Sequence, residues 1–482
     1  MLFSSLIFLY LFLPITLLGY YLSPHKLKNY WLLLTSLVFF AWGGVGFTLI
    51  LICSIGLNYI FGILIQKTIQ TSAAYWWAFA GVAVNILLLG VFKYTNFIIT
   101  NINEFLGIIQ VSGFHQTNIA LPIGISFYTF HSLSYLVDIY KRKTTAQKNI
   151  FDLALYITMF SQLIAGPIIR YSDVWQQLSL RTHTLDKFSS GIERFIIGLA
   201  RKVLLANTFA KVADEIFDYY GHCLNAPLAW LGIICYTLQI YFDFAGYSDM
   251  AIGLGRMFGF EFKENFNFPY TAQTVKDFWR RWHISLSTFF RDYVYIPLGG
   301  SKVKPYKVYM NLLFVFFVTG FWHGAKWNFI VWGMFHGFFM LVERLGFEKI
   351  LEKVWKPISN LYTILVVMFA WVLFRANTLG QAFMYWKGMF QFNSNSQQTG
   401  IFLSYLNPEL ITCIIIAVLG SIGTFKTIQT SLRTFQNSGK SGSTLFSYTY
   451  QIFTAIILTA LLYLCTLYLN AGTYNPFIYY RF

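Results

Sequence analysis

Charged residues are scarce in this chain of 482 residues, of which only 11% are Asp, Glu, Lys or Arg. A soluble globular domain carries roughly 25%. Residues 29–66 and 105–137 contain no charged side chain at all, and about 20 mostly apolar residues are enough to cross the hydrocarbon core of a bilayer. This composition excludes a soluble protein and predicts one that crosses a membrane several times.

Acidic residues are the rarest charged type, with 19 Asp and Glu against 35 Lys and Arg, which gives a formal net charge of +16. In a soluble protein this excess would suggest a nucleic-acid partner. Here the basic residues fall in short clusters between apolar stretches, the pattern of cytoplasmic loops in membrane proteins. We therefore expect the lipid bilayer and its anionic lipids as the partner, and no nucleic acid.

Several signatures of known chemistry are missing. The five cysteines form no CxxC pair, so no disulfide framework is expected. Without HExxH, CxxC or a cluster of carboxylates, we expect no metal site. The sequence also lacks the GxSxG turn of serine hydrolases and the Walker A motif of ATPases, so neither a serine triad nor ATP hydrolysis is indicated.

Apolar stretches dominate the rest of the chain. They predict about a dozen membrane spans, near residues 2–22, 30–44, 46–66, 76–99, 119–139, 151–169, 190–210, 227–246, 308–322, 326–343, 360–376, 402–423 and 446–469. The first lacks a basic leader and a cleavage site, so we expect it to be a retained helix. Short or Gly/Pro-interrupted stretches are typical of tilted or re-entrant segments. The predicted fold is an all-α polytopic membrane protein with about 11–13 tilted transmembrane helices and additional interfacial helices.

Three polar segments interrupt this pattern. Residues 272–297 mix basic and aromatic side chains, which predicts either a helix in the membrane interface or the wall of a water-filled cavity. Residues 392–400 and 427–445 are rich in Ser, Thr, Gly, Asn and Gln and are predicted to be loops. We find no internal repeat, so residues 1–482 are expected to form a single domain.

Loop charge predicts the orientation of the protein in the membrane. Basic clusters lie at residues 26–28, 141–148, 280–307 and 349–356. Because Lys and Arg concentrate in cytoplasmic loops, we expect all four clusters on the cytoplasmic side. This orientation would place the N-terminus outside the cytoplasm.

Two histidines, His283 and His323, lie in otherwise apolar sequence. An ionisable side chain at membrane depth is functional by default, and histidine can exchange a proton near neutral pH. His323, which lies between Gly320-Phe-Trp and Gly324, is therefore either a general base or a packed, hydrogen-bonded histidine. The residues around His283 favour a histidine on a membrane-surface helix over a second catalytic residue, as long as no family resemblance is considered.

Other polar residues in apolar stretches are interpreted as structural. His336 follows His323 by 13 residues, more than three helical turns, which is too far for the two to share a proton. His131 is also expected to be structural. Asp243 and Asp249 are expected to form ion pairs with Arg256 or another buried base, although a polar chamber wall remains an alternative.

Eight blocks of the chain resemble one family. They are LPIGISFYTFHSLSYLVDIYK (121–141), SQLIAGPIIRYSD (161–173), GLARKVLLAN (198–207), YFDFAGYSDMAIGLGRMFGF (241–260), NFNFPYTAQTVKDFWRRWHISLSTFFRDYVYIPLGGS (265–301), GFWHGAKWNFIVWGMFHG (320–337), LFRANTLGQAF (373–383) and NPFIYYRF (475–482). The blocks resemble those of the membrane-bound O-acyltransferases, and within them the bacterial alginate O-acetyltransferase branch. His131 departs from this pattern, since the family usually has Gln there.

The resemblance implies a ring of tilted helices around a thinned central chamber. It also implies that His323 is the catalytic base and that His283 is the second motif residue. The residues implied to shape the chamber and bind donor or substrate are Arg280, Trp282, Ser285, Arg291, Asp292 and Trp322.

The resemblance further implies a donor, an acceptor and a partner. No bound cofactor is implied. The acyl donor would be cytoplasmic acetyl-CoA, and its anionic phosphates would pair with the basic side chains of Arg280, Arg281, Lys302 and Lys304. The acceptor would be an extracytoplasmic polysaccharide, reached with an SGNH-hydrolase-like partner at a bacterial inner membrane. The alternatives are peptidoglycan O-acetylation, cellulose acetylation, D-alanyl transfer to teichoic acid, or a transporter or non-catalytic scaffold.

Overall fold

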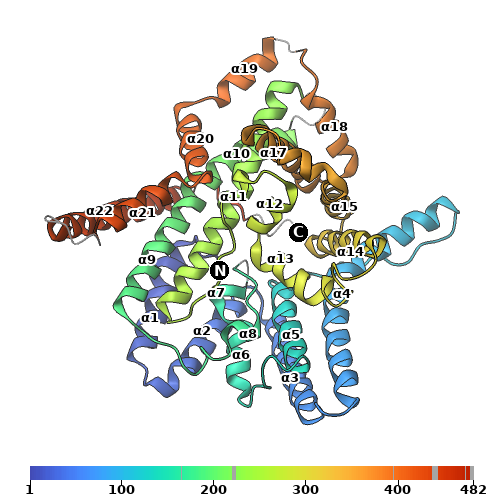
Figure 1. The fold of residues 1–482 in the computed structure, drawn as a ribbon, viewed down its shortest axis with the longest axis vertical. Coiled ribbons are helices and arrows are strands. Elements are labelled where there is room, and N and C mark those ends of the chain that lie inside the picture. Colours follow the sequence, from blue (N-terminus) through green and yellow to red (C-terminus); the bar gives the residue numbers. More distant parts are fainter. Residues whose placement is uncertain (164–165, 220–223, 394–395, 437–442, 473, 478–482) are drawn as a thin grey trace.

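The chain folds almost entirely into helices, as a computed structural model describes for residues 1–163, 166–219, 224–393, 396–436, 443–472 and 474–477 (Figure 1). No strand occurs in these ranges. The helices of the first half are α1 (Leu13–Leu22), α2 (Lys28–Ala41), α3 (Val45–Lys67), α4 (Ala73–Ile108), α5 (Ile125–Tyr140), α6 (Ile150–Thr158), α7 (Phe160–Leu163), α8 (Tyr171–Val174), α9 (Leu185–Ala200), α10 (Asn207–Tyr219) and α11 (Ala226–Met257).

The second half continues in the same way. Its helices are α12 (Val275–Arg281), α13 (Ile284–Phe290), α14 (Pro305–His323), α15 (Trp327–Val342), α16 (Glu348–Leu351), α17 (Lys356–Arg375), α18 (Leu379–Met389), α19 (Ser396–Tyr405), α20 (Pro408–Ser421), α21 (Thr424–Gln436) and α22 (Ser443–Asn470). Short π-helical turns occur at Phe8–Phe12, Arg201–Ala206, Arg291–Tyr295 and Glu343–Phe347, and 3₁₀ turns at His25–Leu27 and Pro269–Thr271.

Six helical segments within the described ranges are long and apolar enough to cross a membrane. They are Val45–Lys67, Ala73–Ile108, Ala226–Met257, Trp327–Leu351, Lys356–Arg375 and Ser447–Asn470. A seventh span is possible if Gln398–Tyr405 and Pro408–Ser421, which meet at 64°, cross together. Both counts are below the predicted 11–13, because several predicted spans are shorter helices. The structure confirms an all-α polytopic membrane protein.

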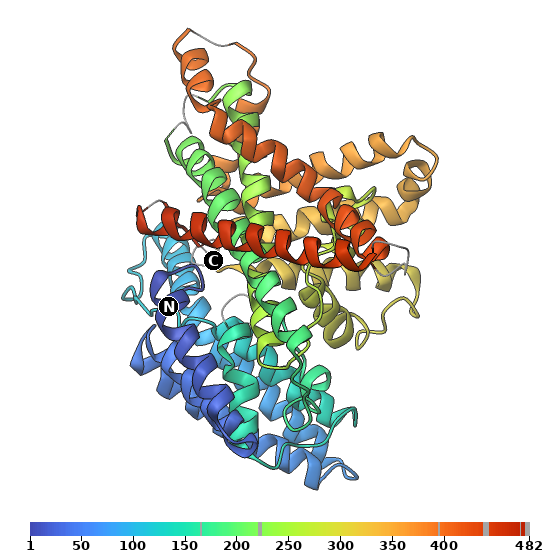
Figure 2. The same ribbon diagram turned by 90° about the vertical axis from the view of Figure 1, so that its left-hand side faces the viewer.

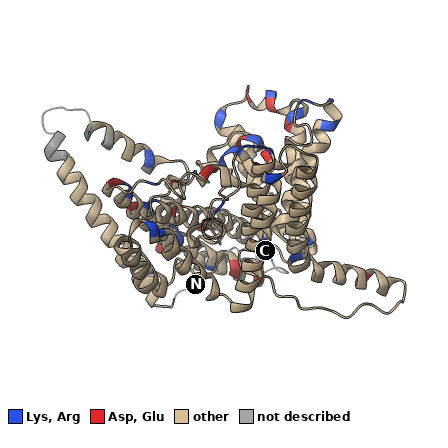
Figure 3. Cartoon of the chain, turned by 90° about the horizontal axis from the view of Figure 1, so that it is seen from below, with Lys and Arg blue, Asp and Glu red and all other residues tan. Residues whose placement is uncertain are grey.

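Helix α11 lies at the centre of the molecule and packs against α9, α10, α17 and α18 (Figure 1). In its most apolar stretch 89% of the residues are buried, against 6% for α22. Figure 2 shows α22 as a long helix crossing the outside of the bundle. Long stretches of the outermost helices carry no charged residue (Figure 3), as expected where helices meet lipid.

The predicted span at 151–169 is wrong. Helix α6 ends at Thr158, because Met159 leaves the helical conformation, and the four-residue α7 follows. The stretch at 119–139 begins its helix late, at Ile125. Gly124 has φ +76, and a Cβ there would lie 2.9 Å from the Leu163 carbonyl oxygen, so a glycine is needed where α5 begins.

Two segments predicted to be polar loops are partly helical. Residues 396–400 begin α19, and residues 427–436 belong to α21, while 437–442 lie outside the described residues. In α21 the threonine hydroxyls donate to carbonyls four residues earlier in the same helix, at 2.8 Å for Thr430 and 2.9 Å for Thr434. Because the helix itself satisfies these side chains, a Thr-rich sequence does not require a loop.

Buried ion pairs connect elements that are distant in sequence. Lys202 and Asp243 lie 2.9 Å apart with 1% of each side chain exposed. Asp249 pairs with Arg194, at 2.8 Å, and with Arg201. The prediction that these carboxylates form structural ion pairs is confirmed, with bases other than Arg256. The thiols of Cys53, Cys235, Cys413 and Cys465 are free, and Cys223 lies outside the described residues.

Candidate active site

The basic and aromatic segment 272–297 buries one face in the protein and leaves Arg280 and Arg291 exposed. It forms α12, α13 and the π-helical turn Arg291–Tyr295. Its aromatic side chains are largely buried, including Phe278, Trp279, Trp282, Phe289 and Phe290. This burial fits the wall of an internal site, while the depth of the segment relative to the membrane interface stays a prediction.

His283 lies at the break between α12 and α13. Its backbone has the left-handed values φ +44 and ψ +55, which are uncommon for a residue with a side chain. Only 1% of the residue is exposed, and its Nδ1 lies 3.1 Å from the side-chain oxygen Oδ1 of Asn265. The ring of Phe244 packs edge-on against the imidazole, with 4.6 Å between ring centroids.

Asn265 holds the whole turn around His283. Its Oδ1 also accepts hydrogen bonds from the backbone nitrogen of Ser285 at 3.2 Å and from the Ser285 hydroxyl at 2.8 Å. The Asn265 backbone oxygen accepts from the nitrogen of Ile284 at 2.9 Å, and its Nδ2 donates to Ser248 at 3.0 Å. Since an amide oxygen only accepts, Nδ1 of His283 carries the proton and Nε2 of the neutral ring is left unprotonated.

His323 is the last residue of α14, and it is buried. Its Nδ1 lies 2.7 Å from the carbonyl oxygen of Thr319, one helical turn earlier. A carbonyl oxygen only accepts hydrogen bonds, so Nδ1 of His323 is the donor, and Nε2 of the neutral ring carries a lone pair that can take a proton. The rings of Trp332 and Phe374 pack against the imidazole at 4.8 and 5.5 Å.

Trp322 connects the two histidines. Its ring centroid lies 4.8 Å from that of His323 and 6.4 Å from that of His283. Ser285, on the His283 turn, also accepts a hydrogen bond from the backbone nitrogen of Ile168 at 2.9 Å. The structure thus brings together His283, Ser285, Trp322 and His323, all of which were predicted from the sequence.

The glycines beside His323 serve helix packing. A Cβ on Gly320 would lie 2.3 Å from the carbonyl oxygen of Phe329, and one on Gly333 would lie 2.3 Å from that of Phe316. Helices α14 and α15 therefore cross at contact distance, as small residues allow. This close crossing fixes the end of α14, and with it the backbone of His323.

The α14–α15 hairpin also brings His336 near the site. His323 and His336 lie on different helices, and both contact Trp332, at 4.8 and 5.2 Å between ring centroids. The prediction that three helical turns separate them is wrong, because it assumed one continuous helix. His336 is fully buried among aromatic rings, and neither ring nitrogen has a hydrogen-bond partner within the described part of the chain.

The predicted charged residues form separate groups. Arg280 is exposed. Asp292 lies 2.6 Å from Arg170 and 2.7 Å from Arg291. Burial alone would raise the pKa of Asp292, but hydrogen bonds from Arg291 and Arg170 outweigh it and hold that pKa below its usual value. Trp282 packs with Phe278 and Trp371 on the other side of the His283 turn.

Two residues of the site were missed in the sequence. Asn265 lies in a loop 18 residues before His283, and although it begins the block 265–301 that resembles the family, no role was predicted for it. Lys93 lies inside the predicted span 76–99, where a charged residue is itself a signal of function. Its Nζ donates to the carbonyl oxygens of Trp322, at 2.5 Å, and His323, at 3.2 Å.

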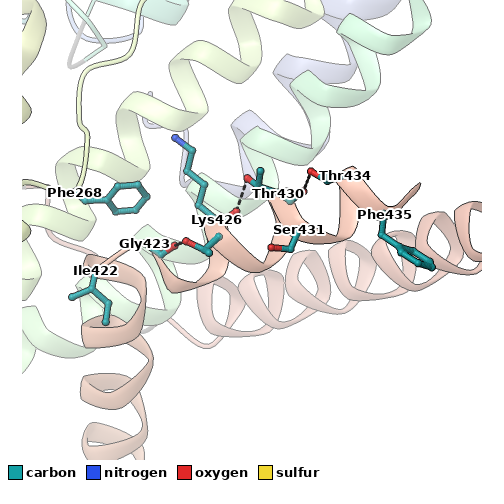
Figure 4. Close-up of a pocket in the computed structure, with 9 residues that line it drawn as sticks. Phe268, Ile422, Gly423, Lys426, Thr430, Ser431, Thr434 and Phe435 are labelled. Atoms are coloured by element: carbon teal, nitrogen blue, oxygen red, sulfur yellow. Dashed lines mark hydrogen bonds between the residues drawn. The ribbon is translucent and has the colours of Figure 1, made fainter. Parts of the chain in front are cut away.

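An open groove of about 730 Å³ lies along α21 and shares no residue with this site (Figure 4). It is lined by Phe268, Ile422, Gly423, Lys426, Thr427, Thr430, Ser431, Thr434 and Phe435. Figure 4 shows threonine hydroxyls bonded to carbonyls of their own helix. We assign the groove no role in the chemistry at the histidines.

The family model of the membrane-bound O-acyltransferases matches residues 141–386, about half of the chain, including both histidines. The chain belongs to the membrane-bound O-acyltransferase family. Over 493 residues, covering all of both proteins, it is 41% identical to a probable alginate O-acetylase of Pseudomonas putida. A probable alginate O-acetylase of Azotobacter vinelandii is 44% identical over 87% of this chain and 83% of its own length.

A relative with a different acceptor is also similar. The peptidoglycan O-acetyltransferase of Helicobacter pylori is 37% identical over 85% of each chain. Membership of the family and these relatives identify the protein as a multi-pass membrane O-acyltransferase. The expected resemblance is thus confirmed.

Proposed function

We propose that this O-acyltransferase takes an acetyl group from cytoplasmic acetyl-CoA and passes it toward hydroxyl groups of an extracytoplasmic polysaccharide, with His323 as the general base. The observation that carries the proposal is the bond from His323 Nδ1 to the Thr319 carbonyl, at 2.7 Å. This bond leaves Nε2 of a buried imidazole as the proton acceptor, which is the state that a base needs before it reacts.

The proposed step is an acyl transfer from sulfur to oxygen. Nε2 of His323 removes the proton from the acceptor hydroxyl while the oxygen of that hydroxyl attacks the thioester carbonyl. A carbon–oxygen bond forms, the carbon–sulfur bond breaks, and the leaving thiolate recovers the proton from the imidazolium. His283, whose ring is fixed by Asn265, is proposed to support this step from the other side of Trp322.

The orientation is proposed from loop charge and is supported by contacts between the basic clusters. Lys141 donates to the carbonyl oxygen of Asp292 at 3.4 Å, and Lys276 lies 2.8 Å from Glu348. The first contact joins the cluster at 141–148 to that at 280–307. The second joins α12, which ends at Arg281, to Glu348, next to the cluster at 349–356. The clusters would thus share the cytoplasmic face of a bacterial inner membrane, where Arg280, Arg281, Lys302 and Lys304 could meet the donor phosphates.

The acceptor is proposed to be alginate or a similar exopolysaccharide, by similarity to relatives named as alginate O-acetylases. Peptidoglycan is the second candidate, since the Helicobacter pylori relative is named for it. In either case we propose a separate extracytoplasmic partner of the SGNH-hydrolase type that completes transfer to the polymer.

The test is mass spectrometry of cell-surface polymers from a deletion strain that carries the wild type, His323→Gln or His131→Gln. His131 is a matched control, because it is also buried and, among the described residues, its ring bonds to the carbonyl of Ile157 alone, at 3.4 Å. We expect His323→Gln to abolish O-acetylation and His131→Gln to retain it, at equal protein levels in the membrane. Wild-type acetylation by His323→Gln would refute the base assignment, and the polymer that loses acetyl groups identifies the acceptor.

A second test concerns the donor. Inverted membrane vesicles that carry the wild-type protein are supplied with acetyl-CoA labelled in the acetyl group. We expect label to reach the polymer only when acetyl-CoA is added on the cytoplasmic face. Equal transfer from labelled free acetate without CoA would refute acetyl-CoA as the donor.

A further inference from the structure

Helix α14 ends inside the protein, and this creates a problem for its backbone. The last carbonyl groups of a helix have no partner within that helix. Gly324, which follows His323, has an extended backbone, with φ −166 and ψ 152, and so does not continue the helix. In a membrane interior, where water is scarce, these carbonyls must be satisfied by other parts of the protein.

Two adjacent residues of α4 satisfy them. Tyr94 donates its hydroxyl to the carbonyl oxygen of Phe321, and the two rings stack with centroids 4.0 Å apart. Lys93 donates to the carbonyl oxygens of Trp322 and His323. Three consecutive carbonyls, including that of the proposed base, are thus bonded to neighbours on one other helix.

The chemistry of Lys93 suits this position in two further ways. A positive charge is favourable at the C-terminal end of a helix, where the aligned peptide dipoles are negative. The third donor of the ammonium group lies 3.4 Å from the Ser126 hydroxyl at the start of α5, and the group lies 5.7 Å from the Trp322 ring centroid. Lys93 therefore connects α4 and α5 to the end of α14.

We propose that Lys93 and Tyr94 are positioning residues for acyl transfer, which cap the end of α14 and thereby hold the His323 imidazole in its reactive place. This inference rests on the proposed role of His323 as base. It adds that the position of the base depends on the Lys93 side chain and the Tyr94 hydroxyl, which belong to α4, more than 200 residues earlier in the chain. Neither side chain is proposed to touch the substrate.

The test measures acetyl transfer from labelled acetyl-CoA in membrane vesicles that contain the full-length protein and the polymer-export machinery. The variants are Lys93→Met, Lys93→Arg and Tyr94→Phe. Thr95→Val is the matched control, since Thr95 is the next residue of α4 and its hydroxyl donates to the carbonyl oxygen of Val91 in the same helix, at 2.7 Å. Rates are divided by the amount of folded protein, measured as the fraction that remains soluble after mild heating in detergent.

A small displacement of a catalytic group can reduce a rate by about 100-fold. For Lys93→Met we expect kcat to fall by roughly 10- to 100-fold, with KM for acetyl-CoA changed by less than about threefold, because positioning acts on the transition state. Lys93→Arg, which keeps a cation and several donors, should recover much of the kcat. Tyr94→Phe should lose less than Lys93→Met, and Thr95→Val should match the wild type.

Three results would overturn the inference. These are a wild-type kcat for folded Lys93→Met, no recovery in Lys93→Arg, or a loss confined to the amount of folded protein. If Lys93→Met does not accumulate, Tyr94→Phe decides, since it removes one hydroxyl only. His323→Gln is measured in parallel. If His323→Gln is active, the proposed base is wrong. If His323→Gln is inactive and Lys93→Met is fully active, the base assignment stands and only the positioning role is refuted.

Discussion

Replacing Asn265 by alanine should release the turn that carries His283. The Asn265 side-chain oxygen accepts three hydrogen bonds, from Nδ1 of His283 at 3.1 Å and from the nitrogen and hydroxyl of Ser285 at 3.2 and 2.8 Å. The substitution also removes the bond that Asn265 Nδ2 donates to Ser248 at 3.0 Å. A hydrogen bond contributes about 1 kcal/mol net, so losing all four should cost about 4 kcal/mol of unfolding free energy. Ser248→Ala, which removes only the bond to Asn265 Nδ2, should cost about 1 kcal/mol.

Unfolding of the purified protein in mixed micelles, titrated with a denaturing detergent, measures these differences. Asn267→Ala is the matched control, because Asn267 lies in the same loop with an exposed side chain and should change the free energy by less than about 0.5 kcal/mol. Acetyl transfer should also fall in Asn265→Ala, because the His283 ring is no longer held. If Asn265→Ala is no less stable than Ser248→Ala, the oxygen does not organise this turn.

Three further predictions concern charged groups. Lys202→Met should destabilise the protein by about 3–5 kcal/mol, because Asp243 is left buried without its cation, and Lys202→Met combined with Asp243→Leu should recover most of that loss in the same titration. The pKa of Asp292 is lowered in the folded protein, so its ionised form stabilises the fold above the unfolded pKa of about 3.9, and this contribution is lost as the pH falls through the folded value. The stability difference between the wild type and Asp292→Asn should therefore persist at pH 7 and vanish at strongly acidic pH; a difference independent of pH would contradict the ion pair. Raising the ionic strength should weaken acetyl-CoA binding to the wild type and have less effect on Lys302→Gln/Lys304→Gln; equal effects would mean that these lysines serve topology only.

The sequence predicted the class of fold because hydropathy alone reports burial in lipid. The long helices α3 and α17 follow from it directly. Hydropathy failed where neighbouring helices decide the conformation. The apolar stretch at 151–169 breaks at Met159. Composition was misleading in α21, where a Thr-rich segment is helical and its hydroxyls bond to carbonyls of the same helix.

The two histidines were predictable, but their surroundings were not. An ionisable residue in an apolar stretch can be recognised without a structure, which singled out His283 and His323. Asn265 and Tyr94 are ordinary residues in their own segments, and only the packing of distant elements brings them to the histidines. His336 was misjudged for the same reason, since the spacing along one helix does not describe a hairpin.

Both histidines lie where a helix stops. His283 lies between α12 and α13, and His323 ends α14. A helix end leaves backbone groups unpaired, and in a dry interior each of them needs a partner. At His283 the partners come from Asn265, and at His323 they come from Lys93 and Tyr94. The same polar groups that allow a helix to end inside the protein therefore also hold the backbone that carries each histidine. A mutation at one of these partners should consequently affect stability and acyl transfer together, whereas a mutation of His323 itself should affect acyl transfer far more than stability.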